Sequence, residues 1–169
     1  PLICGNRPPA KTTSERRKKI FTRVICHADS QCTNSNISTV PTIYVFNAAA
    51  ITKPHAIEQL STELSGYSID VAVISETHLK KKHLSERFCI DGYTLFRRDR
   101  PARRGGGVAI YVHQHLQPTA WAFHGHTDDA FELLWIKVTI GQKDVFICAL
   151  YHPPNPPYRP STLLDYMEK

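Results

Sequence analysis

Two polar side chains that could bind a metal or a phosphate end apolar, β-branched segments of the sequence. Asn47 ends TIYVFN, which covers residues 42–47, and Glu76 ends DVAVISE, which covers residues 70–76. Carboxylate oxygens are ligands of hard cations such as Mg²⁺, and a side-chain amide can hydrogen-bond a phosphate. A carboxylate and an amide at neighbouring strand ends therefore suggest a metal and phosphate site.

The segment between these two residues predicts how they are brought together. We expect a helix there, because Pro54 suits a first helical position and apolar residues from Ile57 to Leu64 recur at helical spacing. A strand, a helix and a strand in this order form a crossover, which makes the two strands parallel. If the strands pair directly, Asn47 and Glu76 emerge at the same sheet edge, where ligand sites of such sheets lie.

Downstream, the sequence predicts a sheet-rich body. We expect strands over residues 93–97, 108–112, 131–140 and 144–151, with Gly141 and Gln142 as the turn of a hairpin between the last two. A proline-rich connector leads to a final helix, expected to open at Ser161 or Thr162.

Several segments, in their order along the chain, resemble a known family. After NAAAITKPHAIEQL and DVAVISETHL come RRGGGVAIYV at residues 103–112, FELLWIKV at 131–138 and ICALYHPPN at 147–155. The set resembles the amino-terminal part of the endonuclease/exonuclease/phosphatase family, in the apurinic-endonuclease-like branch carried by non-LTR, LINE-type retrotransposons. It implies an α+β fold, a four-layer α/β/β/α sandwich of which about the first half is present.

The resemblance also implies roles for four residues. Glu76 matches the family's metal-binding glutamate, with Mg²⁺ as the expected ion and Mn²⁺ as its alternative. Asn47 matches an asparagine that orients the scissile phosphate or nearby carboxylates, Tyr151 matches a tyrosine that hydrogen-bonds the phosphate, and Asn155 is a weaker match beside it. Ordinary structural alternatives stay open, since a strand-ending Glu can cap a turn, an Asn can form an Asx-turn and a Tyr before two prolines can serve packing alone.

Two segments of the relatives have no counterpart here. In those proteins a Gly-Asp-x-Asn segment and a later Ser-Asp-His segment supply groups that position and activate the attacking water. Asp165 is no substitute, because a carboxylate near a helix start is expected to be solvated. A missing general base costs a factor of about 10²–10⁴. We therefore expect a truncated Mg²⁺-dependent DNA endonuclease with little activity of its own and poor solubility.

Two other functions remain as alternatives. The first is a non-catalytic, basic nucleic-acid-binding remnant, whose DNA binding would be indifferent to Mg²⁺ and to Glu76. The second is a phosphomonoesterase of the same fold, against which the retrotransposon-like segments NAAAITK and RGGGVAIY speak.

The chain is basic, with a net charge of +6 and a pI of about 9.2. Five arginines lie in one stretch before the glycines of residues 105–107: Arg97, Arg98, Arg100, Arg103 and Arg104. A loop of this kind can bind DNA phosphates without reading sequence, although a solvated hairpin loop is an equal alternative. Lys80, Lys81 and Lys82 form a second basic run.

The sequence also predicts how the chain divides into regions and where in the cell it is found. We expect residues 1–40 to be a basic, disordered leader and residues 41–169 the domain, with residues 20–25 too short and isolated to alter that division. We expect neither a signal peptide nor a membrane-spanning segment, because no apolar run of the required kind or length is present in this sequence. We expect an intracellular, nuclear protein that binds DNA and the reverse transcriptase region of the same polyprotein, without a defined oligomer.

Cysteines and histidines give no evidence of a further metal site. The five cysteines include no C-x-x-C pair, so that neither a disulfide framework nor a zinc module is indicated. The nine histidines are scattered without ligand spacing, although His113 and His115 would share one strand face. Reduced thiols are expected.

Overall fold

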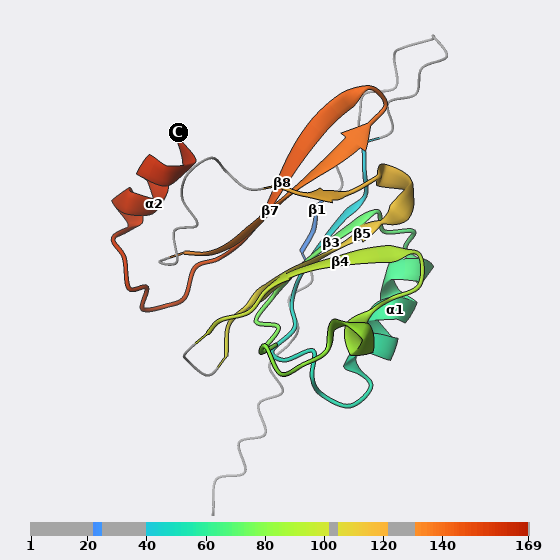
Figure 1. The fold of residues 1–169 in the computed structure, drawn as a ribbon, viewed down its shortest axis with the longest axis horizontal. Coiled ribbons are helices and arrows are strands. Elements are labelled where there is room, and N and C mark those ends of the chain that lie inside the picture. The colour runs from blue at the N-terminus through green and yellow to red at the C-terminus, as the bar shows by residue number, and fades with distance from the viewer. Residues whose placement is uncertain (1–21, 25–39, 102–104, 122–130, 169) are drawn as a thin grey trace, which may run out of the picture.

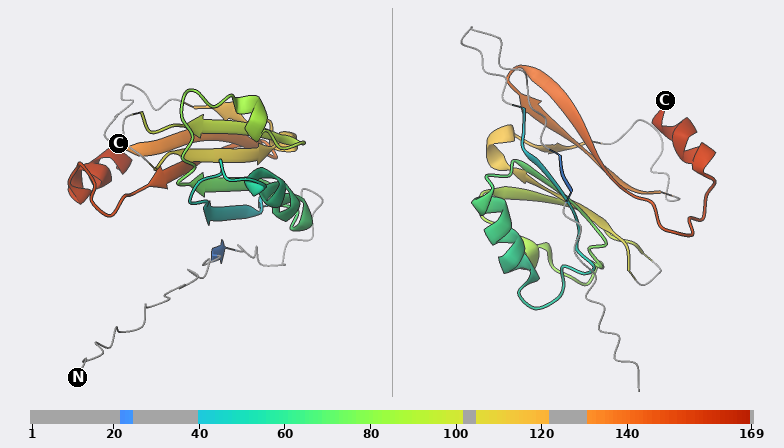
Figure 2. Two further views of the ribbon diagram at one scale, coloured as in Figure 1. Left: turned by 90° about the horizontal axis from the view of Figure 1, so that it is seen from below. Right: turned by 180° about the vertical axis from the view of Figure 1, so that it is seen from behind.

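Two β-sheets lie face to face between two helices (Figures 1 and 2). The structure is a computed structural model, and it describes residues 22–24, 40–101, 105–121 and 131–168. Across the molecule the layers are α1 (Ala56–Gly66), a five-stranded sheet, a three-stranded sheet and α2 (Pro160–Met167). This arrangement confirms the α+β class and the four-layer order expected from the sequence.

The five-stranded sheet contains the predicted crossover. Its strand order is β1 (Thr22–Val24), β2 (Ile43–Asn47), β3 (Val71–Ser75), β5 (Val108–His113) and β4 (Tyr93–Arg98). β2 and β3 pair directly and in parallel, with α1 as their connection, whereas every other pairing of this sheet is antiparallel. The direct pairing expected for the two apolar segments is therefore confirmed.

The three-stranded sheet is built around one long hairpin. Its order is β6 (Thr119–Ala120), β7 (Glu132–Ile140) and β8 (Lys143–Tyr151). The turn is the predicted pair of residues 141 and 142, and Gly141 has φ 62°, a left-handed value that glycine adopts without steric cost. Two short 3₁₀ helices, η1 (Ser85–Phe88) and η2 (Gln114–Leu116), complete the described elements.

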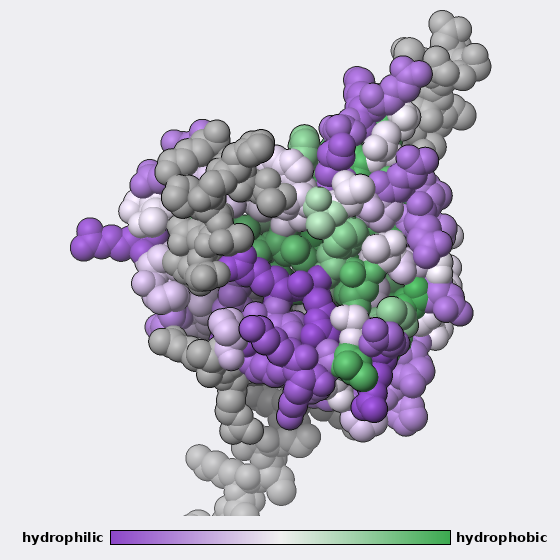
Figure 3. Space-filling model, viewed as in Figure 1, coloured by the Kyte–Doolittle hydropathy of each residue, from purple (hydrophilic) through white to green (hydrophobic). Residues whose placement is uncertain are grey.

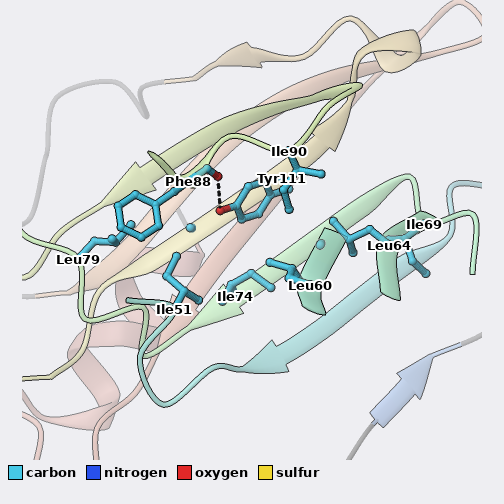
Figure 4. Close-up of a cluster of buried hydrophobic side chains, with 11 residues drawn as sticks. Ile51, Leu60, Leu64, Ile69, Ile74, Leu79, Phe88, Ile90 and Tyr111 are labelled. Atoms are coloured by element: carbon cyan, nitrogen blue, oxygen red, sulfur yellow. Dashed lines mark hydrogen bonds between the residues drawn. The ribbon is translucent and has the colours of Figure 1, made fainter. Parts of the chain in front are cut away.

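Strands β3 and β5 are buried on both faces, which explains their continuous apolar sequence. One face packs against α1 in a first core, where Leu60, Leu64, Ile74 and Tyr111 meet (Figure 4). The Tyr111 hydroxyl donates to the Phe88 carbonyl oxygen at 2.8 Å, so this buried polar group is satisfied.

The opposite face of the same strands packs on the second sheet. In this second core, Ile110 and Val112 of β5 meet Ile136 and Val138 of β7. A third, smaller core lies on the outer face of β7, where Leu133 packs with side chains of α2. None of the helices in the described part of the chain has the length and hydrophobicity needed to cross a membrane.

Two expected helix starts were wrong. α1 begins at Ala56 rather than at Pro54, because His55 has a left-handed φ of 61° and cannot lie inside the helix. α2 begins at Pro160, ahead of the expected Ser161 or Thr162, with the proline in its first turn, where no N–H is required. Thr22–Val24 lies within the expected leader, yet it pairs with β2 as an edge strand; the rest of residues 1–39 falls outside the described residues.

Candidate active site between the two sheets

Asn47 and Glu76 lie at one edge of the five-stranded sheet, as predicted. In the parallel β2–β3 pair Asn47 is the register partner of Ser75, and Glu76 follows immediately. Beyond the strands, the Ala48 and Ala50 N–H groups donate to the carbonyl oxygens of Ser75 and Glu76 at 3.0 and 2.9 Å. The turns that carry the two candidate residues are thus hydrogen-bonded to each other.

These two turns contain several residues with strained, left-handed backbone conformations. Ala49, Ala50, Glu76 and His78 all have positive φ values, between 44° and 89°. Such a conformation costs a non-glycine residue of the order of 1–3 kcal/mol and persists only where the surroundings enforce it. Here the enforcement comes partly from the glycine segment, since the Thr77 and His78 N–H groups donate to glycine carbonyl oxygens. Strain of this kind is typical of functional sites.

A hydrogen bond joins Glu76 to the other sheet. The Tyr151 hydroxyl, at the end of β8, donates to Glu76 Oε1 at 2.6 Å. Burial raises the pKa of Tyr151 to about 12, with the hydrogen bond and negative charge of Glu76 as further causes, while Arg100 acts in the opposite direction. Tyr151 therefore stays protonated at neutral pH and acts as a donor, which holds the carboxylate in one orientation.

The other two candidate residues are not part of this contact. Asn47 Oδ1 accepts the Ala49 N–H at 3.1 Å, which is the Asx-turn that the sequence left open as an alternative. Its Nδ2 group is a hydrogen-bond donor. Asn155 is exposed in the connector before α2, and among the described residues its side chain makes no hydrogen bond to the site.

Three of the five arginines expected in a DNA-binding loop are engaged with protein groups. Arg97 and Arg98 lie inside β4, where Arg97 pairs with Asp99 at 2.9 Å and Arg98 donates to a β7 carbonyl oxygen. Arg100 pairs with Glu132. Arg103 and Arg104 lie outside the described residues. The nearby Lys81 and Lys82, by contrast, are exposed.

Glu132 is a site residue that the sequence reasoning missed. It begins β7 directly opposite Tyr151, accepts the Gly107 N–H at 2.8 Å and pairs with Arg100. The sequence contained a signal for this placement of Glu132. A two-residue turn at 141 and 142 pairs Ile140 with Lys143 and, eight residues further along each strand, Glu132 with Tyr151.

The donor set fits a loosely held hard cation. Within the described ranges no three His, Cys, Asp or Glu side chains converge, and among the predicted site residues Glu76 is the one that carries a carboxylate. Mg²⁺ keeps several waters and is commonly bound by one or two carboxylates and substrate phosphates. Glu76, oriented by a neutral donor, and the amide of Asn47 at the same edge match this requirement.

Comparisons with known proteins agree on the fold. The AP endonuclease LMAP from Leishmania major is 17% identical, with a TM-score of 0.53 over 73% of this chain and 43% of that chain. The endonuclease domain of TRAS1, a telomere-specific non-LTR retrotransposon, is 15% identical, with a TM-score of 0.51 over 75% of this chain and 50% of that chain. No family model and no curated protein sequence matches.

The chain thus spans about half the length of these structures. At this level of identity the likeness concerns the fold, and it agrees with the fold implied by the ordered sequence segments. The chain has the α+β fold of an AP-endonuclease-like domain, the fold also found in a retrotransposon endonuclease.

Proposed function

We propose that this chain forms part of a Mg²⁺-dependent DNA endonuclease of the non-LTR retrotransposon kind, with Glu76 as the metal ligand. The observation that carries the proposal is the Tyr151–Glu76 hydrogen bond, which joins the ends of β8 and β3 across the two sheets. It lies at a strained edge of a fold shared with an AP endonuclease and a retrotransposon endonuclease domain. Mn²⁺ is the alternative ion.

Each residue has a defined part in this proposal. When bound, the divalent cation supplies positive charge to phosphate oxygens and lowers the pKa of a coordinated water. Glu76 binds the cation, Tyr151 fixes the Glu76 carboxylate, and the Asn47 amide donates to a phosphate oxygen. The cation would also offset the negative charge of Glu76 next to a phosphate.

The chain by itself is proposed to hydrolyse DNA slowly. In the part of the chain that the structure describes, Tyr151 alone hydrogen-bonds the Glu76 side chain, and a phenol with a pKa of about 12 is protonated at neutral pH and cannot accept a proton from water. A positioned base contributes about 10²–10⁴-fold in rate. Metal and DNA binding do not need that base and should persist. Nuclear location and association with a reverse transcriptase region belong to the same proposal.

The test compares duplex DNA binding and plasmid nicking with and without Mg²⁺. We expect Mg²⁺ to raise the affinity for duplex DNA in the unmodified chain and to have no effect in Glu76→Gln, with plasmid nicking near background in both. Glu86→Gln is the matched control, because Glu86 is exposed in η1. DNA binding indifferent to Mg²⁺ and to Glu76 would overturn the proposal and favour the non-catalytic binding remnant.

A further inference from the structure

We propose that Arg100 and Glu132 are positioning residues of the candidate site, whose ion pair holds the Tyr151 ring where its hydroxyl reaches Glu76. The inference rests on the proposed function, since it assigns two further residues to that site. The contact itself, however, can be measured without metal, DNA or activity.

The contacts place the pair directly against Tyr151. Glu132 and Tyr151 are register partners in the β7–β8 hairpin, so their side chains are neighbours on the same sheet face. Arg100 follows β4, a strand of the five-stranded sheet. Its Nε donates to Glu132 Oε1 at 2.5 Å. The guanidinium carbon lies 5.7 Å from the centroid of the Tyr151 ring, within the range of a cation–π contact.

Both oxygens of the Glu132 carboxylate are held. Oε1 accepts from Arg100, and Oε2 accepts the Gly107 N–H at 2.8 Å. The side chains of Arg100 and Glu132 are only 18% and 19% exposed, so the pair is less screened than a surface ion pair and costly to break at one end. A carboxylate fixed at two points, with a guanidinium fixed to it, forms a rigid support for the neighbouring ring.

The glycine segment is what allows the pair to close. A Cβ atom on residue 106 would lie 2.3 Å from Arg100 Cζ and 2.5 Å from Glu132 Oε2, and Gly106 has φ +65°. Any larger residue would displace the ion pair. Gly141 offers a comparison, because its φ is +62° while nothing lies within 4 Å of its Cβ position.

The experiment measures exchange of the Tyr151 hydroxyl proton at neutral pH by NMR on the full chain with ¹³C-labelled tyrosine, assigned with Tyr151→Phe. We expect slow exchange in the unmodified chain. Arg100→Gln, Glu132→Gln and Gly106→Ala should each speed exchange about tenfold, equivalent to about 1.4 kcal/mol of lost protection. Arg100→Lys should restore only part of the protection, because an ammonium cannot reproduce the guanidinium geometry.

Controls separate positioning from a general loss of stability. Gly141→Ala repeats the backbone strain without the collision, and Lys137→Gln removes an exposed β7–β8 ion pair, with Asp144 at 3.0 Å. Both should leave Tyr151 exchange unchanged, with amide spectra confirming a folded chain in every variant. Unchanged exchange in folded Arg100→Gln and Glu132→Gln would overturn the inference. The Arg100–Glu132 ion pair would then only connect the two sheets. Failure of Glu76 to bind a cation would instead contradict the proposed function, and the effect of the variants on Tyr151 exchange would still hold.

Discussion

At the scale of single residues, Tyr151 and Glu76 form a hydrogen bond in which the phenol donates and the carboxylate accepts. The carboxylate sits in a left-handed backbone conformation at a strand end, and the phenol gives it one strong donor from the opposite sheet. A hydrogen bond to a charged group contributes more than one between neutral groups, typically about 1.5–3 kcal/mol. The contact therefore links the stability of the two sheets to the geometry of the site.

Removal of that donor gives a direct test of its strength. Tyr151→Phe should lower the free energy of unfolding by about 1–2 kcal/mol, because the ring is kept while the half-buried carboxylate loses its partner. Urea denaturation measures the change. Tyr67→Phe is the matched control, since Tyr67 is 61% exposed and its substitution should cost less than about 0.5 kcal/mol. Equal effects of the two substitutions would show that the Tyr151–Glu76 hydrogen bond adds nothing to stability.

At the scale of elements, the exposed Lys81 and Lys82 between β3 and η1 are better candidates for phosphate contacts in the proposed function than the arginines of β4. Lys80 is anchored, since its Nζ donates to the Arg100 carbonyl oxygen at 2.8 Å and its own carbonyl accepts from Arg97. Lys81 and Lys82 then project from a turn closed by the His83 N–H. Hydrophilic side chains also cover the lower part of the face shown in Figure 3.

The salt dependence of DNA affinity tests whether Lys81 and Lys82 contact phosphates. The double variant Lys81→Gln, Lys82→Gln should reduce the slope of log affinity against log salt by about 2, since each phosphate contact contributes about 0.9. Lys143→Gln, at the far end of β8, should leave the slope unchanged. Fluorescence anisotropy with one duplex at several salt concentrations measures it. An unchanged slope in the lysine double variant would exclude this loop as a phosphate-binding element.

Local sequence patterns predicted the elements well and the side-chain partners poorly. The apolar runs ending at Asn47 and Glu76 and the turn at Gly141 depend on neighbours in sequence, and the structure confirms all three. The internal ion pair of Arg100 depends on a contact between two sheets, which composition does not reveal. The start of α1 at Ala56, two residues after the expected Pro54, also depends on a contact distant in sequence. The turn from Ala48 to Ile51, which precedes the helix, is hydrogen-bonded to the segment that follows β3.

At the scale of the whole molecule, the two sheets leave hydrophobic surface uncovered. Val45 and Phe146 are 47% and 46% exposed, and a band of hydrophobic residues crosses the face shown in Figure 3. Within the described residues, β8 pairs on one side only and is nine residues long. Long edge strands with apolar neighbours favour association. We expect self-association that rises with concentration in sedimentation velocity; a sharp, cooperative melt of a monomer would contradict this.

Stability should fall when the pH rises above about 10, the ordinary pKa of tyrosine. Burial is the main cause that raises the pKa of Tyr44, Tyr93, Tyr111 and Tyr158 in the folded chain. Above pH 10 the unfolded chain has therefore lost protons that the folded chain retains, and each further rise in pH favours unfolding.

Urea denaturation on either side of about pH 10 measures this effect. Tyr111→Phe, which keeps the buried ring but removes its titration, should show a smaller loss between the two pH values than the unmodified chain. Stability that stays level or rises across this interval would contradict the assignment.

We propose above all that Glu76 binds a divalent cation at the edge shared by β2 and β3. Titration with Mn²⁺, followed by paramagnetic broadening of amide NMR signals, tests it most directly, because broadening marks the residues nearest the ion. We expect the signals of residues 47–50 and 75–78 to broaden first and Glu76→Gln to abolish the effect. Broadening that survives in Glu76→Gln, or that begins around His113, His115 and Asp70 at the other end of the sheet, would contradict it.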